Sequence, residues 1–191
     1  WNASCTAACV PGDADGDGQV VVLDVVILVD IILSSSDSYD DCADINQDGE
    51  ITVLDIVAIV EVILGGNGRS ADATSATMNI SNDTVSISGN GFIGAIQMTL
   101  SHGAGFSIDL TDDAMVADYR TNGDMTTLIV VVPNSDEIFT TSGEFEVEEV
   151  IVVGGEGYVP LSMPNTFTLS AAYPNPFNPS TSLDMNIPAD G

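Results

Sequence analysis

Two stretches of the chain repeat one pattern of alternating acids, a glycine and a long aliphatic run. The first reads DADGDGQVVVLDVVILVDIIL from Asp13, and the second reads DINQDGEITVLDIVAIVEVIL from Asp44, 31 residues further on. Each unit is an acidic loop followed by an apolar segment. A repeat of two such units predicts a paired module rather than a longer solenoid.

The acids in each repeat have the spacing of a calcium-binding loop. Side-chain oxygens fall at loop positions one, three, five and twelve, with glycine at six and a main-chain carbonyl at seven. The predicted ligands are Asp13, Asp15, Asp17, Gln19 through its carbonyl and Asp24 in the first loop, and Asp44, Asn46, Asp48, Glu50 through its carbonyl and Asp55 in the second. Calcium takes about six to eight oxygen ligands, whereas zinc prefers imidazole or thiolate. Because the chain has one histidine and its cysteines lie outside both loops, we predict two Ca²⁺ ions.

Two other interpretations of these stretches were weighed. Aspartate and glycine are common in plain turns, and β-branched runs favour strands. Turn chemistry does not require a fixed acid six residues after the glycine, so two loops in phase favour metal sites followed by helices. The run from Val20 to Leu33 has only Asp24 and Asp30 as polar breaks, so its helix must be buried on more than one side. One side can pack on the sister helix, and the other needs the chain's own β domain or a partner.

Residues 11–66 resemble type I dockerin modules, in which two such loops end in aspartate and each is followed by a single helix. The resemblance implies a pseudo-twofold axis between the units and a cohesin, a β-sandwich domain, as the partner. The family's recognition positions are the tenth and eleventh of each loop. They fall on Val22 and Leu23 and on Val53 and Leu54, two Val-Leu pairs that imply either face can dock. Further along the helices, Val29, Asp30, Val60 and Glu61 replace the family's basic or hydroxyl residues, so an acidic partner face is not expected.

After a linker at residues 67–75, the pattern changes to short, partly alternating, β-branched segments separated by Gly, Asn and Asp. TVSIS, FIGAIQMTL, FSIDL, TTLIVVV and EFEVEEVIVV predict an antiparallel β-sandwich at residues 76–163. This region resembles a cohesin-like sandwich. The expected fold class is therefore α+β, a small helical calcium module at residues 11–66 joined to an antiparallel sandwich, with residues 1–10 as an N-terminal segment.

The tail at residues 164–191 is rich in proline, and YPNPFNPSTSLDMNIP resembles the opening of the C-terminal sorting domain used by type IX secretion. Leu183, Met185 and Ile187 alternate with polar residues and predict one strand. That strand is either a remnant of a longer domain or a donor strand for a neighbour's sheet.

Charge and composition narrow the partners and the location. The chain has 29 acidic residues against Arg69 and Arg120, a formal net charge of -27, which excludes nucleic acid and anionic membranes as partners. The most apolar run is too short and too charged to cross a bilayer, so no membrane insertion is expected. The chain begins at Trp1 without a leader, and we expect an exported bacterial protein, extracellular or at the cell surface. Export makes a disulfide between Cys42 and either Cys5 or Cys9 plausible.

These patterns predict no enzyme. His102 is the single histidine, and no Ser or Cys motif accompanies it. The first hypothesis is a non-catalytic extracellular calcium-binding scaffolding protein with dockerin–cohesin-type association. Its partner sandwich belongs to the same chain, a neighbouring copy or another protein, and joining neighbouring copies would give a homopolymeric surface filament. The alternative is a carbohydrate-binding or tethering accessory module of a larger secreted enzyme.

Overall fold

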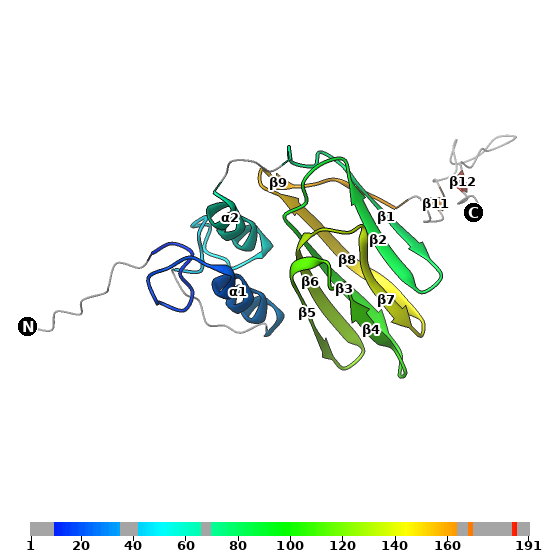
Figure 1. The fold of residues 1–191 in the computed structure, drawn as a ribbon. Coiled ribbons are helices and arrows are strands. Elements are labelled where there is room, and N and C mark those ends of the chain that lie inside the picture. The colour runs from blue at the N-terminus through cyan, green and yellow to red at the C-terminus, as the bar shows by residue number, and fades with distance from the viewer. Residues whose placement is uncertain (1–9, 35–41, 66–69, 164–167, 170–184, 187–191) are drawn as a thin grey trace, which may run out of the picture.

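The computed structural model describes residues 10–34, 42–65 and 70–163, and the backbone of residues 168–169 and 185–186. Figure 1 shows two helices lying beside a β-sandwich, so the α+β fold class is confirmed. The helices are α1 (Val22–Ser34) and α2 (Val53–Leu64). In the part of the chain that the structure describes, no helix has the length and apolar character needed to cross a membrane.

Each helix begins two residues before the acid that closes its loop, so that acid lies in the first turn. At α2 the Thr52 hydroxyl accepts a hydrogen bond from the Leu54 N–H (3.2 Å), and the Asp55 carboxylate accepts one from the Thr52 N–H (2.9 Å). This is a capping box, and it satisfies two of the free N–H groups at the helix start. At α1 the equivalent acid, Asp24, accepts from the Val21 N–H at 2.8 Å. Loop and helix are therefore one continuous hydrogen-bonded unit in both repeats.

The sandwich consists of two five-stranded sheets. The first has the order β10 (Leu161–Ser162), β1 (Ala76–Ser81), β2 (Thr84–Gly89), β7 (Glu137–Ser142) and β4 (Ser107–Leu110). The second has the order β5 (Ala114–Asn122), β6 (Met125–Pro133), β3 (Ala95–His102), β8 (Phe145–Gly154) and β9 (Gly157–Tyr158). The short β10 pairs in parallel with β1, so the first sheet is mixed rather than purely antiparallel as expected.

In the tail, β11 (Thr168–Leu169) pairs antiparallel with β12 (Met185–Asn186). The strand expected around Met185 therefore has a partner strand within its own chain. The sequence predicted one strand here, as a remnant or as a donor to a neighbour's sheet, and did not predict this pairing with Thr168–Leu169. The rest of the tail lies outside the described residues.

The second sheet is buried on both faces along the middle of β6, one of its inner strands. Along β6, Leu128 and Val130 point into the core between the sheets, whereas Ile129 and Val131 belong to a separate apolar cluster with the helices. All four side chains are fully buried. A strand that is covered on both sides has no polar face, which explains the continuous apolar run LIVVV in the sequence.

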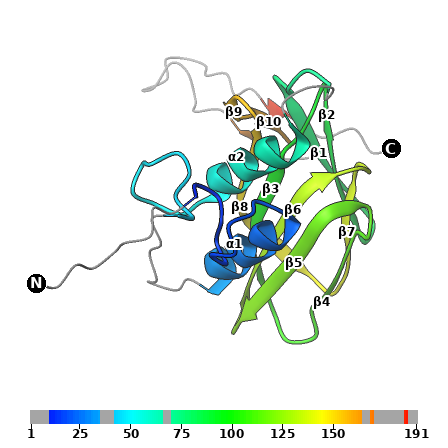
Figure 2. The same ribbon diagram turned by 60° about the vertical axis from the view of Figure 1, so that its left-hand side comes forward.

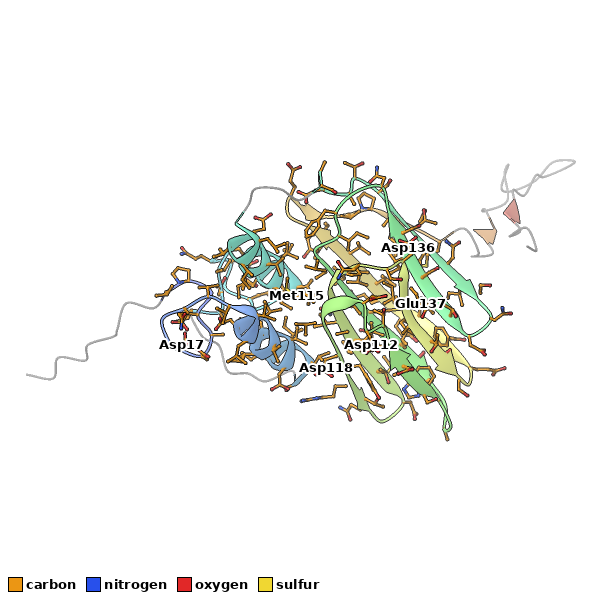
Figure 3. The ribbon with its side chains drawn as sticks, in the orientation of Figure 1. Asp17, Asp112, Met115, Asp118, Asp136 and Glu137 are labelled. Atoms are coloured by element: carbon orange, nitrogen blue, oxygen red, sulfur yellow. The ribbon has the colours of Figure 1, made fainter. Side chains whose placement is uncertain are left out.

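The helices cover the outer face of this second sheet, as the two views in Figures 1 and 2 agree. α1 lies over β5 and β6, and α2 lies over β3 and β8. From the sandwich, Ala95, Ile129, Val131 and Val153 meet helix residues such as Leu28 in one buried cluster. Met115 of β5 also packs against this cluster, and Figure 3 shows it between the helices and the sheet. The second buried side that the apolar helices require is thus provided by the chain's own sandwich.

α2 approaches the sandwich most closely at Gly94, just before β3. A Cβ atom on Gly94 would lie 2.8 Å from Cγ2 and 2.9 Å from Cγ1 of Val57. Real Cβ atoms do not tolerate such a contact, so glycine is required here for steric reasons. The backbone at this point is held by hydrogen bonds on both sides, from Gly94 N–H to the Val153 carbonyl (2.7 Å) and from Val132 N–H to the Gly94 carbonyl (2.8 Å).

We predict that Gly94→Ala destabilises the protein by about 1–3 kcal/mol, because the added methyl group overpacks the contact with Val57. Denaturant unfolding measures the change. Gly103→Ala is the matched control, since nothing lies within 4 Å of a Cβ at that position. Adding Val57→Ala to Gly94→Ala should recover part of the loss. Equal stability of the Gly94 and Gly103 variants would contradict the docking of α2 on the sandwich.

Candidate metal centre and docking face

The first loop gathers three carboxylates around one point. Oxygens of Asp13, Asp15 and Asp17 all lie within 4.8 Å of one another. Asp13 is buried and the other two are exposed. The Asp13 carboxylate accepts hydrogen bonds from the N–H groups of Asp17 (3.0 Å) and Gly18 (2.8 Å), which wraps the loop around it. Gly18 has a φ of 89°, a left-handed conformation that favours glycine.

Asp24 closes this loop from the far end. Its side chain is fully buried and accepts from the N–H groups of Ala14 (2.8 Å) and Asp15 (3.3 Å) through one oxygen. The other oxygen accepts from Val21, as described above. A carboxylate buried in this way is stabilised by its hydrogen bonds. These bonds join the last residue of the loop, Asp24, to its second and third residues, Ala14 and Asp15. Figure 3 shows that the loop, marked by Asp17, lies on the side of the helices away from the sandwich.

The second loop repeats these bonds residue for residue. Asp44 accepts from the N–H groups of Asp48 (3.2 Å) and Gly49 (2.9 Å), and Asp55 accepts from those of Ile45 (3.0 Å) and Asn46 (3.3 Å). Asn46 replaces the acid of the first loop, and its amide donates to Asp48 at 2.9 Å. The two loops therefore have the same geometry, but the second offers one ligand carboxylate fewer, while Glu50 keeps the number of acids in the two loops equal.

The seventh residue of each loop is also held in place. The N–H of Gln19 donates to Asp17 at 2.8 Å, and the N–H of Glu50 donates to Asp48 at 2.9 Å. Both side chains are exposed. This leaves the main-chain carbonyls, as the sequence predicts, as the groups that these positions offer a cation. With carboxylate and main-chain carbonyl oxygens in both loops, and the Asn46 amide oxygen in the second, the donor set fits calcium.

Desolvation, together with neighbouring negative charges, raises the pKa of two of these acids. At Asp15 a hydrogen bond from the Asp17 N–H lowers the pKa, but desolvation and the charges of Asp17, Asp24 and Asp13 together raise it above its usual value. Burial raises the pKa of Asp55, against hydrogen bonds from the Thr52, Asn46 and Ile45 N–H groups that lower it, and the Asp44 charge adds to the rise. A raised folded-state pKa means that ionising the acid opposes folding. The associated stability is present below the ordinary aspartate pKa of 3.8 and is lost as the pH rises through the folded-state value. A bound cation would offset this cost.

The two loops are joined at Gly12 and Cys42. The Gly12 N–H donates to the Cys42 carbonyl at 2.8 Å, and a Cβ on Gly12 would lie 2.8 Å from Ile45. The segment that enters the first loop thus runs directly beside the segment that enters the second. Cys5 and Cys9, the predicted disulfide partners of Cys42, lie outside the described residues.

The two Val-Leu pairs expected at the docking faces differ in burial. Val22 and Leu23 are exposed, Leu23 by 53% of its surface, whereas Val53 is only 2% exposed and Leu54 is half-buried. Val53 belongs to the buried apolar cluster that the helices form with the sheet, and Leu54 packs against that cluster. The first pair at the start of α1 faces solvent.

Three contacts in this region were missed or only partly predicted from the sequence. Nothing in the sequence indicated the steric role of Gly94, because that role depends on the position of Val57 in the folded protein. The capping box of Thr52 and Asp55 was readable in the stretch TVLD. The sequence shows Arg120 as one of two basic residues but does not identify its acidic partner. In the structure this arginine contacts Asp30 at 2.9 Å and donates to the Ser34 hydroxyl, which joins β5 to the end of α1. Both charged groups are about half exposed or more, so the pair contributes about 0–1 kcal/mol.

Comparisons with known proteins agree with part of this picture. No curated protein matches the chain. Among solved structures, the chain is similar to a non-cellulosomal cohesin from the hyperthermophilic archaeon Archaeoglobus fulgidus. The match has 12% sequence identity and a TM-score of 0.33, and covers 50% of this chain and 86% of that one. A TM-score this low does not establish a shared fold. The helical region is better defined, because residues 11–64, which hold both loops with α1 and α2, match the family model of the dockerin type I domain.

Proposed function

We propose that this protein is a non-catalytic, calcium-binding assembly module that acts outside the cell, and that its dockerin-type part binds a cohesin-type β-sandwich. One observation carries the proposal. The helices that match the dockerin type I domain are seated on the outer face of a β-sheet through a continuous buried apolar cluster. The geometry is that of a helical module bound to a sandwich, here within one chain.

Calcium is the cation that the two loops suit. In the first loop Asp13, Asp15, Asp17 and Asp24 would hold it with the Gln19 carbonyl, and in the second Asp44, Asn46, Asp48 and Asp55 would hold it with the Glu50 carbonyl. Bound calcium supplies positive charge where acids repel one another. Dockerin type I domains bind calcium, which supports two such sites here.

The loops couple charge to the docking of the helices. Asp24 and Asp55 lie in the first turn of α1 and α2 and also close the loops, so an ordered loop fixes the helix start. The next turn of α2 carries Val57, which packs against Gly94 of the sandwich. Ordering the loops therefore places the apolar helix surface on the sheet. Removing the cation leaves the acids uncompensated and loosens this arrangement.

The proposed extracellular location is supported by two features of the sequence and by the distribution of calcium. The tail resembles the start of a secretion sorting domain, the cysteines flank the loops as a disulfide would require, and calcium is more abundant outside cells than inside. The large negative charge suits a medium in which ions screen it. A bacterial exported protein is the source that these features favour.

A groove on the sandwich supports the second candidate, a carbohydrate-binding accessory. It has a volume of about 670 Å³ and is lined by Asp83, Ser101, His102, Glu144 and Phe145 among others. One face of the His102 ring stacks on Phe106, with 4.2 Å between ring centroids. Binding in a glycan array that is lost in Phe145→Ala would favour this function. No binding to any glycan on the array would favour the assembly function.

We predict that Asp24→Ala combined with Asp55→Ala abolishes the helical circular dichroism signal gained on adding calcium. Each substitution removes a ligand and a helix cap together. In the wild type, calcium at 100 times its dissociation constant should add about 2.7 kcal/mol of stability per site. Asp109→Ala with Asp124→Ala is a control of equal charge change outside the loops. A wild-type spectrum that is identical in calcium and in chelator would contradict the proposal.

We also predict that Cys42 forms a disulfide with Cys5 or Cys9. The bond would fasten the N-terminal segment to the second loop, beside the hydrogen bond from Gly12 to Cys42. Peptide mapping without reductant should yield one cross-linked peptide containing Cys42, and reduction should cost about 2–4 kcal/mol of stability. Alkylation of all three cysteines in the unreduced protein would contradict the prediction.

A further inference from the structure

We propose that the sheet face covered by the helical module also accepts the module of a second copy of this chain. By helical module we mean residues 11–64, and by sheet face the outer surface of β5, β6, β3 and β8 around Ala95, Ile129, Val131 and Val153. The protein then has a closed form, as in Figure 1, and an exchanged form in which copies swap modules. This inference rests on the proposed function, in which calcium orders the module.

The module and the sandwich are joined by side-chain packing that can separate as a unit. Among the described residues, none of the helical module lies in the core between the two sheets, which is built from strand residues such as Met98, Leu100 and Phe139 together with loop residues of the sandwich. The cluster under the helices is a different one, to which both parts contribute. The sandwich interior is therefore complete in both forms, and only the sheet face changes its occupant.

The covalent connection between the two parts is short. α2 ends at Leu64, and Gly65 caps it with a φ of 71°. From residue 71 onward the chain is fixed to the sandwich. The Phe92 N–H donates to the Ala71 carbonyl (2.8 Å), and Asp72 accepts from the Gly155 N–H (3.1 Å). A Cβ on Gly91 would lie 2.4 Å from the Ala71 carbonyl oxygen, so this attachment is tight.

Residues 65–70 are thus the tether, and fully extended they reach about 20 Å. In the exchanged form this length holds two sandwiches side by side. Exchange of an identical element across such a hinge is a low-cost route to a dimer, because it creates no contact that the closed form lacks.

Two contacts between the module and the sheet face favour a second copy over an unrelated partner. The sheet face offers a steric notch at Gly94 that fits Val57, and both are encoded in this chain. It also offers Arg120 opposite Asp30. The chain has only two basic residues, so a basic group at this edge is a specific complement to the module's acid. A second copy brings the same Val57 and Asp30.

The balance between the two forms depends on chain density. Their contacts are the same, so the closed form is favoured only by its tether, which gives an effective concentration on the order of 1 mM for a short linker. Dilute chains are therefore closed, and crowded chains exchange. Calcium removal frees the modules, and calcium return lets each one find its own sheet or a neighbour's.

A complementary pair of variants tests the proposal. The Gly94→Ala chain has a sheet face that clashes with its own Val57. The Val57→Ala chain has a smaller module and an unaltered sheet face. When the two are mixed, exchange restores the native Val57–Gly94 fit on one side and relieves the clash on the other. The chain with both substitutions fits itself and is the matched control.

Each chain, and the equimolar mixture, is prepared at a protein concentration of about 0.1 mM. Calcium is removed with chelator and then restored. The mass is then measured by light scattering and native mass spectrometry. We expect a heterodimer in the mixture, at least tenfold more abundant than any dimer of either variant alone, and a monomeric control. Masses beyond the dimer that contain both variants also support exchange, as open-ended linkage. Monomers in the mixture, with the helical signal of both variants recovered, would overturn the proposal.

If either variant fails to recover its helical signal, isotope-labelled and unlabelled wild-type chains are cycled together at about millimolar concentration. Dimers of mixed mass support exchange, and their absence overturns it. The wild-type spectrum in calcium and in chelator separates this result from the proposed function. Mixed dimers from a chain that does not respond to calcium would support exchange and contradict the calcium role.

Discussion

The packing of the helices on the outer face of the second sheet is the contact on which the rest of the structure depends. Without it, β6 would present Ile129 and Val131 to water, and the apolar helices would lack their second buried side. Burying the two surfaces against each other stabilises the fold by about 25 cal/mol for each Å² of apolar surface removed from water. The same contact explains why glycine stands at position 94, since the bulk of Val57 fills the space that a side chain would need.

The acids of the loops have two roles that cannot be separated. Asp55 closes the second loop and, with Thr52, caps α2, while Asp24 does the corresponding work at α1. An aspartate in the first turn also interacts favourably with the positive end of the helix dipole. Burial raises the pKa of Asp55, and the Asp44 charge adds to the rise, so the charge of Asp55 costs stability until a cation offsets it. The position of each helix on the sheet is in this way linked to the electrostatics of its loop.

The two repeats share the hydrogen bonds made by the first and last acids of their loops, but equivalent residues differ in burial. Both loops make the same backbone bonds to their first and last acids, yet Val53 is buried where Val22 is exposed. A pseudo-symmetric module cannot present both of its ends to one sheet. Docking on a single sandwich therefore makes residues at equivalent loop positions differ in exposure.

The sequence by itself determined the local structure. The spacing from Asp13 to Asp24 predicted the first loop, and the β-branched segments after the linker predicted the sandwich, because these features depend on neighbours along the chain. The apolar helices also showed that a second cover was needed. Only the tertiary structure decided that this cover is the chain's own sheet, that Arg120 meets Asp30, and that β10 pairs in parallel with β1. Those contacts join residues far apart in the chain, and their fit depends on shapes that exist only once both parts have folded.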